Sequence, residues 1–382
     1  MGDLVKLMDV CDINMGQSPD SASYNSDHRG LPFFQGNADF GEMSPSVRLW
    51  CDAPTKIATA GDLLVSVRAP IGAINVANCQ CCIGRGLAAL TAKVNVCDPS
   101  WLYFALVSRV PEMQKQGTGS TFKAINKNGL MNLSLPKCSL NKQREIANRL
   151  HTIRSLCKSR QQQLDILDKL AKSRFIEMFG DPFENPKGWP QKNLKSLSER
   201  LSDGPFGSNL KSEHYSTCGV RVIRLQNIGV NEFVDKDKAF VSPEHYEVIK
   251  KYTCQSGDIV IGTLGEPNLR ACLIPEYINI AINKADCVHF VNKKDVVDKK
   301  FVCFYLNLPS TLSLAAGMVH GQTRARISSG QLANLPVFCP PLTLQNKFAA
   351  FIEELDKSKV TIQKSLDRLN LLYKALLQEY FG

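Results

Sequence analysis

The sequence predicts an α+β protein with two mixed α/β blocks, separated by two long antiparallel coiled-coil helices and related by a pseudo-twofold internal repeat. Three observations predict this fold. The helix ending "RFIEMFG" at Arg174 returns as "ALLQEYFG" at Ala375, with the two Phe-Gly pairs 202 residues apart. A heptad stripe of apolar residues precedes both endings. The rest of the chain consists mostly of short β-branched runs punctuated by glycine.

The internal repeat extends upstream of the two helix endings. At the shift of 202 residues, "ISSGQLANLPVFCPPLTLQNKFA" from Ile327 aligns with "INKNGLMNLSLPKCSLNKQREIA" from Ile125. Farther upstream, "GDIVIGT" at Gly257 resembles "GDLLVSV" at Gly61, at an offset of 196. The repeat is therefore a variable block followed by a constant block, which indicates duplication of a whole structural unit.

The order of the elements follows from this pattern. The variable blocks, 1–141 and 191–343, read as strands, turns and short helices, with one helix expected in "PSWLYFALVSRVPEMQ" and one in "KKFVCFYLNLPSTLSLAAG". The constant blocks, 142–179 and 344–382, are expected to be long helices because neither contains an internal Pro or Gly. Residues 180–190, "GDPFENPKGWP", form a linker.

Each constant block carries an apolar stripe that steps by four and three residues, as in a heptad seam. Since a lone amphipathic helix is unstable, we expect the two seams to pack on each other in an antiparallel pair; packing of each helix on its own block is the alternative. Arg160 and Lys359 interrupt the seams, where they either set the helix register or face solvent. The predicted seam residues are Ile146, Leu150, Ile153, Leu164, Leu167, Phe348, Ile352, Leu355, Ile362, Leu366 and Leu369.

Composition narrows the class of protein. The net charge of +10 permits a nucleic-acid partner. Residues 142–179, with nine basic and four acidic residues, contribute half of this excess. No apolar run reaches the roughly 20 residues of a membrane span, and the first residues lack the pattern of a signal peptide, so we expect a cytoplasmic protein. The fourteen cysteines are mostly scattered in apolar runs and are expected to be reduced thiols rather than metal ligands.

Catalytic motifs are absent from the sequence. "GRGLAA" at Gly84 does not complete a dinucleotide fingerprint, and "GPFGSNLKS" at Gly204 lacks the glycine that precedes the lysine of a phosphate loop. "DPF" at Asp181 lacks one proline of the tetrapeptide of adenine methyltransferases. We therefore expect neither a catalytic site nor a metal site in this chain.

Polar loops at corresponding places in both blocks carry the recognition chemistry. Amide, hydroxyl and basic side chains are the groups that contact base edges and phosphates, and their recurrence in both copies favours this role over ordinary polar turns. The residues predicted to bind DNA are Gln17, Ser18, Ser21, Tyr24, Asn25, Gln35, Asn37, Arg68 and Lys123 in the first block, and Ser208, Asn209, Lys211, Arg224, Gln226, Asn227, Arg270, Arg324 and Arg326 in the second.

Together these stretches resemble the specificity (S) subunits of type I restriction-modification systems, over the whole chain. "GLPFFQGNADFG", "GDLLVSVRAPIGAIN", "CCIGRGLAAL", "GSTFKAI" and "NKQREIANRL" resemble one class of target-recognition domain in that family. "DGPFGSNLK" and "VRVIRLQNI" resemble a second class, and "RFIEMFGDPFENPKGWP" resembles the family's central conserved region.

The resemblance implies that 1–141 and 191–343 are target-recognition domains, each reading one half of an asymmetric split site in double-stranded DNA. It implies that the helices 142–179 and 344–382 dock two methyltransferase (M) subunits, which bind S-adenosylmethionine, and that restriction (R) subunits consume ATP with Mg. This chain would then bind no cofactor and act in phage defence as a non-catalytic subunit. The alternatives are a coiled-coil scaffold, another DNA-binding repeat protein, or a self-contained methyltransferase or nuclease.

Overall fold

The computed structural model describes residues 3–117, 123–319, 321 and 326–382. The chain divides into two compact units, of which unit 1 comprises residues 1–162 and 363–382, and unit 2 comprises residues 163–362. Each unit thus holds one variable block and a part of each long helix. This division differs from the predicted domain boundaries, which separated the helices from the blocks.

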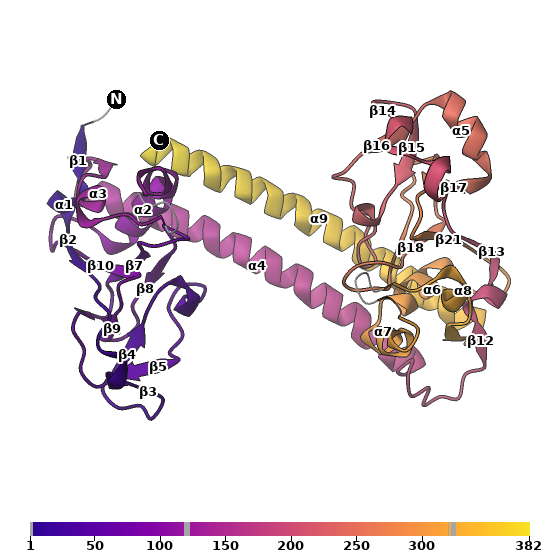
Figure 1. The fold of residues 1–382 in the computed structure, drawn as a ribbon, viewed down its shortest axis with the longest axis horizontal. Helices are drawn as coiled ribbons and strands as arrows, with labels where there is room; N and C mark the ends of the chain where they lie inside the picture. Colours follow the sequence, from indigo (N-terminus) through magenta and orange to yellow (C-terminus); the bar gives the residue numbers. More distant parts are fainter. Residues whose placement is uncertain (1–2, 118–122, 320, 322–325) are drawn as a thin grey trace. The chain divides into compact units, whose positions relative to one another are not determined.

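The first block of unit 1 forms a four-stranded, a five-stranded and a two-stranded sheet (Figure 1). In spatial order these are β2 (Cys11–Met15), β10 (Leu87–Ala92), β7 (Leu63–Ser66) and β8 (Ile74–Val76); then β3 (Tyr24–Asn25), β5 (Leu49–Cys51), β4 (Leu31–Phe34), β9 (Cys81–Ile83) and β6 (Ile57–Ala58); then β1 (Leu4–Lys6) with β11 (Ser134–Pro136). Its helices are α1 (Leu7–Val10), α2 (Pro99–Gln116) and α3 (Lys127–Met131), with 3₁₀ turns η1 (Ser21–Ser23) and η2 (Asn37–Asp39).

The second block, in unit 2, forms the same three kinds of sheet. In spatial order these are β13 (Ser198–Ser202), β21 (Cys287–Asn292), β18 (Ile259–Gly262) and β19 (Arg270–Leu273); then β14 (Tyr215–Ser216), β16 (Ala239–Val241), β15 (Val220–Ile223), β20 (Ile280–Asn283) and β17 (Thr253–Gln255); then β12 (Gln191–Asn193) with β22 (Pro336–Phe338). Its helices are α5 (Pro243–Ile249), α6 (Lys299–Leu306), α7 (Pro309–Ala316) and α8 (Ser329–Ala333), with 3₁₀ turns η3 (Leu194–Leu197), η4 (Gly207–Asn209), η5 (Ser212–His214), η6 (Leu225–Asn227) and η7 (Lys250–Tyr252).

The two blocks share one strand order. Each five-stranded sheet contains a single parallel pair, β4 with β9 in the first block and β15 with β20 in the second, and all other pairs in both blocks are antiparallel. The duplication therefore covers the whole variable block, although the sequence repeat is recognisable upstream only in short stretches. The predicted α+β fold with an internal repeat is confirmed.

The core of unit 1 joins the four-stranded sheet to the helices. Val65 and Leu90 of the sheet, Trp101 of α2, Leu150 of α4 (Leu140–Phe179) and Phe381 of α9 (Leu342–Phe381) belong to one buried cluster. The ring centroids of Trp101 and Phe381 are 5.8 Å apart. The end of α9 is therefore part of the first block's core.

The core of unit 2 is rich in aromatic rings. Phe175 and Phe179 of α4 are fully buried, and the ring of Phe175 lies 5.6 Å from that of Phe301 in α6 and 5.3 Å from that of Phe348 in α9. The end of α4 and the beginning of α9 thus pack on the second block as well as on each other.

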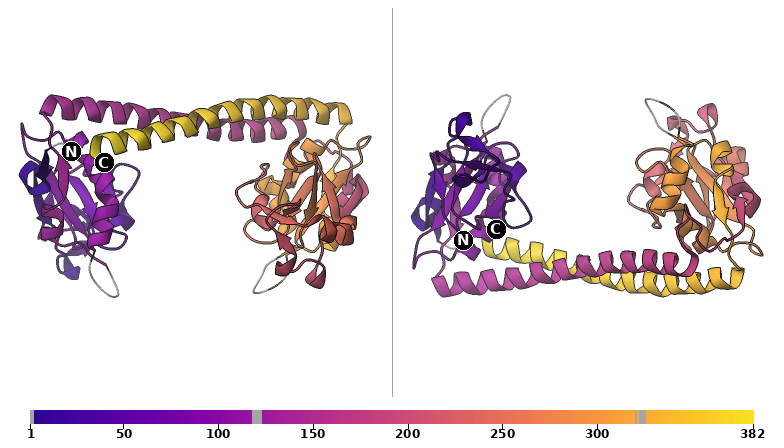
Figure 2. Two further views of the ribbon diagram at one scale, coloured as in Figure 1. Left: turned by 90° about the horizontal axis from the view of Figure 1, so that it is seen from above. Right: turned by 90° about the horizontal axis from the view of Figure 1, so that it is seen from below.

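The two long helices run antiparallel within each unit (Figure 2). In unit 1, Arg149 near the start of α4 donates to the Tyr380 hydroxyl near the end of α9, at 3.1 Å. In unit 2, Lys359 forms an ion pair with Asp168 at 2.6 Å, so this interruption of the seam is a pairing position between the helices. Of the predicted seam residues, Ile146, Leu150, Ile153, Phe348, Leu355 and Leu366 are buried, and Leu164, Leu167, Ile352, Ile362 and Leu369 are partly buried.

One predicted helix is wrong. The stretch "KKFVCFYLNLPSTLSLAAG" forms two helices, α6 and α7, instead of one. Pro309 lacks a backbone N–H and disfavours the helical conformation of the residue before it, and Leu308 is extended, with φ −74° and ψ 142°. The proline therefore begins α7 rather than continuing α6.

Residues 180–190 terminate α4. Gly180 adopts a φ of +85° and its N–H donates to the carbonyl of Ile176, as expected for a glycine just beyond a helix. Lys187 donates to the carbonyls of Glu177 and Met178, at 2.8 and 2.9 Å, and the Trp189 indole donates to that of Phe179. The linker thus satisfies the carbonyls that the helix end leaves free.

Candidate nucleic-acid interface

A polar pocket with a volume of about 520 Å³ lies in the first block. It brings together six of the nine residues predicted there to bind DNA, from three separate segments of the chain. Its lining consists of Ser18, Pro19, Ser21, Tyr24, Gln35, Gly36, Asn37, Ser66, Arg68, Ala69, Arg85 and Gly86. Hydroxyl, amide and guanidinium groups therefore face one shared space.

The turns around this pocket are held by hydrogen bonds and ring packing. Tyr24 stacks on Phe33, with ring centroids 4.6 Å apart, and its hydroxyl donates to the carbonyl of Pro19 at 2.9 Å. The buried carboxylate of Asp39 accepts from the backbone N–H groups of Gln35 and Gly36, at 2.7 and 3.3 Å. Asp39 therefore fixes the turn that carries Gln35, and the backbone position from which the Gln35 side chain extends is defined.

Two arginines give the pocket its charge. Arg68 and Arg85 are exposed, and neither guanidinium forms an ion pair or hydrogen bond with another of the residues that the structure describes. Arg85 was missed in the sequence, although it lies in "CCIGRGLAAL"; an arginine between two glycines was the available signal. Unpaired guanidinium groups at a polar pocket are suited to phosphate oxygens or to the edge of guanine.

The other three predicted residues of the first block lie outside the pocket lining. Asn25 forms its own turn, because its side chain accepts from Arg29 N and donates to Arg29 O, at 3.0 and 3.1 Å. The backbone N–H of Gln17 donates to the carbonyl of Ile83. Lys123 is exposed, and its carbonyl accepts from Ala69 N at 3.1 Å, next to the lining residue Arg68.

In the second block, the first predicted loop is exposed. Ser208 and Asn209 lie in η4, and Lys211 follows them 3.6 Å from the carboxylate of Glu213. The carbonyl of Asn209 is 3.0 Å from the ring nitrogen of His245, which lies in α5. These side chains are accessible to a ligand.

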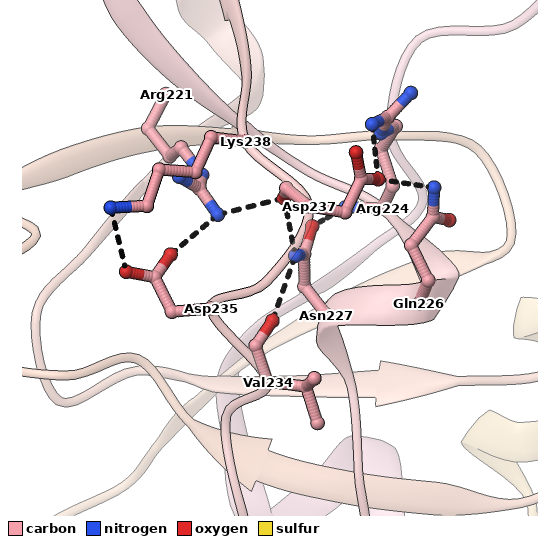
Figure 3. Close-up of polar contacts among 8 residues, drawn as sticks. All are labelled: Arg221, Arg224, Gln226, Asn227, Val234, Asp235, Asp237 and Lys238. Carbon is pink, nitrogen blue, oxygen red and sulfur yellow. Dashed lines mark hydrogen bonds and ion pairs between the residues drawn. The ribbon is translucent and has the colours of Figure 1, made fainter. Parts of the chain in front are cut away.

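The second predicted loop is tied to acidic residues (Figure 3). The Arg224 guanidinium and the Gln226 amide both donate to the carboxylate of Asp237. Asn227 is fully buried: its amide donates to the carbonyls of Val234 and Asp237, and its oxygen accepts from Arg224 N. The geometry gives Asn227 a structural role and corrects its assignment to the DNA surface, while Arg224 and Gln226 remain candidates.

Arg270 also has a structural role. Its guanidinium donates to the backbone carbonyls of Ile228, Leu264, Pro267 and Leu225, at 2.7 to 3.1 Å. Because these four bonds use most of its five donors, Arg270 holds two turns together and has few donors for a phosphate. The prediction that it contacts DNA is therefore not supported by its geometry.

The last predicted loop is described in part. Arg326 is half-exposed and lies 3.7 Å from the carboxylate of Asp286, whereas Arg324 lies outside the described residues. Close by, burial raises the pKa of the Asp203 carboxyl, and the charge of Asp286 adds to this, while a hydrogen bond from Ser329 and the charge of Arg326 oppose it. Basic and acidic groups therefore alternate in this part of the second block.

The thiols of Cys81 and Cys82 in the first block are not ionised. Burial raises the pKa of the Cys81 thiol to about 12 and, with smaller contributions from neighbours, that of Cys82 to about 11, so both are protonated at neutral pH. Within the described ranges, no three His, Cys, Asp or Glu side chains gather as metal ligands, and no helix is long and apolar enough to cross a bilayer.

Comparison with known proteins places the first block in a family. Residues 3–167 match the family described as "Type I restriction modification DNA specificity domain". The chain is 38% identical over 160 residues to the "Putative type I restriction enzyme MjaX specificity subunit" of Methanocaldococcus jannaschii, which covers 42% of this chain and 38% of that protein. The chain thus spans well under half the length of that relative.

Two further similarities cover most of the chain. The "Type I restriction enzyme MjaIX specificity subunit" of M. jannaschii is 23% identical over 357 residues, which are 88% of this chain and 80% of that protein. The crystal structure of the type I restriction-modification S subunit from M. genitalium has a TM-score of 0.63 at 18% identity, and the match covers 100% of this chain and 96% of that chain. Residues 3–167 therefore match a type I restriction modification DNA specificity domain, as the sequence predicted, and the whole chain has the fold of the type I restriction-modification S subunit from M. genitalium.

Proposed function

We propose that this chain is the non-catalytic DNA-recognition subunit of a type I restriction-modification complex, and that it reads an asymmetric two-part target. The observation that carries the proposal is the polar pocket of the first block, in a segment that matches a DNA specificity domain. Hydroxyls, amides and guanidinium groups are the donors and acceptors that base edges and phosphates require.

The asymmetry of the target follows from the side chains. The two blocks share a strand order, so equivalent loops start from equivalent places on the sheets. The first block offers Gln35 just before its turn η2 and Asn37 within it, whereas the second offers Arg224 just before η6 and Gln226 within it. Glutamine and asparagine suit adenine and arginine suits guanine, so the two half-sites are expected to differ in sequence.

We further propose that α4 and α9 dock two methyltransferase subunits. Besides the seam, each unit exposes large apolar side chains on these helices: Leu156, Leu371 and Leu372 in unit 1, and Ile166, Leu170, Ile176 and Val360 in unit 2. Exposed apolar residues on helices are typical of surfaces that a partner covers. Since both units carry such residues, a copy of the partner for each unit is the simplest arrangement.

In this proposal the chemistry belongs to the partners. The M subunits bind S-adenosylmethionine and methylate adenine, and the R subunits use ATP and Mg to cut DNA. The present chain recognises the target sequence, and it binds no cofactor itself. Because each long helix has 40 residues, about 60 Å at 1.5 Å per residue, the helices would set a fixed, unread spacer between the half-sites.

Reconstitution tests the proposal. Duplex DNA and labelled S-adenosylmethionine are incubated with the M subunit alone, with this chain alone, and with both. We expect sequence-specific methyl transfer only with both, and log affinity in gel shifts should fall linearly with log salt concentration. Methyl transfer by this chain alone would make it an enzyme, and a complex that never binds DNA would make it a scaffold; either result would contradict the proposal.

A further inference from the structure

The second block carries a charged loop, residues 234–238, with two aspartates and two lysines, that faces the turn η6 (Figure 3). The loop is anchored through its main chain. Asn227 donates to the carbonyls of Val234 and Asp237, at 2.9 and 2.8 Å, and Arg221 donates to the Asp237 carbonyl at 3.0 Å. The position of Asp237 is therefore fixed without any contribution from its own side chain.

This anchoring leaves the Asp237 carboxylate free to hold two other side chains. One of its oxygens accepts from both the Arg224 guanidinium and the Gln226 amide. The Arg224 guanidinium also lies 5.8 Å from the ring centre of Tyr215, whose other cationic neighbour is Lys284, at 5.7 Å. Arg224 is thus held by both a carboxylate and an aromatic face, and its side chain is 25% exposed.

The bonds to Asp237 leave the base-reading groups of both side chains available. Arginine has five N–H donors. Asp237 takes one on Nη2, and Nε is buried and has no hydrogen-bond partner among the described residues, so the remaining Nη hydrogens form the accessible edge of Arg224. Two such donors match O6 and N7 of guanine. Gln226 keeps one amide hydrogen and its oxygen, the pair that matches N7 and N6 of adenine.

The same carboxylate changes the charge that Arg224 presents. An arginine beside a carboxylate is close to neutral as a pair, so its attraction to a phosphate is much weaker than that of a free arginine. Its hydrogen bonds to a base edge depend on geometry, and the carboxylate improves that geometry by limiting side-chain rotation. Asp237 therefore favours base contacts over phosphate contacts.

We propose that Asp237 is a positioning residue for DNA recognition: it aligns Arg224 and Gln226 for adjacent base edges and suppresses their binding to the phosphate backbone. The inference rests on the proposed function, and it assigns the specificity of the second half-site to a carboxylate that touches no DNA. Asp235 does not share this role: its partner Arg221 has an 8% exposed side chain and is unavailable to a ligand, and its other partner, Lys238, lacks the paired donors that a guanine edge requires.

The test compares variants of the full chain with its methyltransferase partners, on duplexes selected from a library of randomised sequence. Asp237→Asn keeps the main-chain anchors and removes the charge. It should lose preference at one or two adjacent base pairs in one half-site and bind a scrambled duplex more tightly. On that duplex, the slope of log affinity against log salt should become steeper by about 0.9, the value for one more neutralised phosphate.

Three further variants make the result specific. Asp237→Glu should retain the base preference, and Gln226→Leu, at an exposed side chain, should relax it within the same base pairs. Glu247→Gln removes an equal charge from an exposed ion pair with Lys250 in the same unit and should change neither base preference nor salt slope. Partial unfolding lowers the active fraction but leaves both of these quantities unchanged.

The outcomes separate this inference from the proposed function. Unchanged base preference and salt slope in Asp237→Asn, with a wild-type chain that selects a two-part target, would overturn the role of Asp237 alone. Loss of preference in both half-sites would also overturn it, because the loop belongs to one block. A wild-type complex that selects no sequence at all would instead overturn the proposed function.

Discussion

The two blocks have one strand order, but Arg68 and Arg85 of the first block differ in their pairing from Arg221 and Arg224 of the second. In the first block, Arg68 and Arg85 face an open polar pocket and pair with no other residue in the described part of the chain. In the second block, Arg221 and Arg224 are paired with Asp235 and Asp237. Because the strand order is the same, the difference arises from the side chains and not from the topology, so one fold can present either unpaired or charge-paired arginines.

This contrast has a functional consequence. The first block should supply much of the electrostatic affinity for DNA, which is insensitive to sequence and sensitive to salt. The second block should supply contacts that depend more on the bases. The blocks would then divide affinity and selectivity between them, and variants that affect one block should leave the other unchanged.

The largest expected effect on stability comes from removing a ring from the aromatic core of unit 2. Phe175→Ala deletes a fully buried ring surrounded by Phe301, Phe304 and Phe348, and should lower the free energy of unfolding of unit 2 by about 3–5 kcal/mol. Urea unfolding combined with hydrogen exchange in each block measures the loss. Phe183→Ala, at a 64% exposed ring, is the control. Equal loss of protection in the first block would contradict the independence of the two cores.

A smaller loss of stability, equal in the two blocks, is expected when a pair of equivalent buried glutamines is replaced. Gln143 and Gln345 are both buried; each accepts from one backbone N–H, of Asp98 or Asp298, and donates to two carbonyls. Gln143→Leu and Gln345→Leu should each cost about 2–3 kcal/mol, because the buried backbone groups lose their partners. Thermal unfolding of the two variants provides the comparison, and a clear loss in one variant only would mean that the repeat is not energetically equivalent.

Arg68→Ala with Arg85→Ala should weaken DNA binding by about tenfold or more, roughly 1.4 kcal/mol. If both arginines neutralise phosphates, the salt slope should fall by about 1.8, at about 0.9 for each phosphate that is no longer neutralised. Gel shifts across a salt series measure both quantities. Arg29→Ala is the control, since Arg29 is exposed near the carboxylates of Asp27 and Asp52. An unchanged slope would show that the pocket does not face the DNA backbone.

The smallest effect is expected for Arg326→Ala. Asp286, 3.7 Å away, already offsets part of the charge of Arg326, so affinity for DNA should fall by less than for the arginines of the first block. Assembly with the M subunit, followed by size-exclusion chromatography, should be normal. A loss of assembly would mean that this loop faces the partner rather than DNA.

The long helices could be predicted closely because their signal is periodic and uninterrupted. The structure begins α4 at Leu140 and α9 at Leu342, each two residues before the start expected from the heptad stripe. The equivalence of the two blocks was harder to recognise, because strand order is set by pairings between distant segments and insertions shift the alignment from 202 to 196 residues. The break before Pro309 was visible in the sequence but was outweighed by the apolar run around it.

The candidate site was predictable as residue types but not as partnerships. Six residues from separate loops of the first block do line one pocket, because polar residues beside glycine-rich turns tend to face solvent. The sequence could not indicate that Arg270 donates to four backbone carbonyls, or that Arg224 donates to the carboxylate of Asp237. Such pairings depend on which loops the sheets bring together.

The central claim is that one chain carries two unlike DNA readers. Sequencing of methylated adenines in cells with and without this chain tests it most directly. We predict a two-part motif with unrelated halves and a spacer of constant length, present only when the chain is expressed. A continuous or palindromic motif, or a methylation pattern that is the same in both cells, would contradict the account.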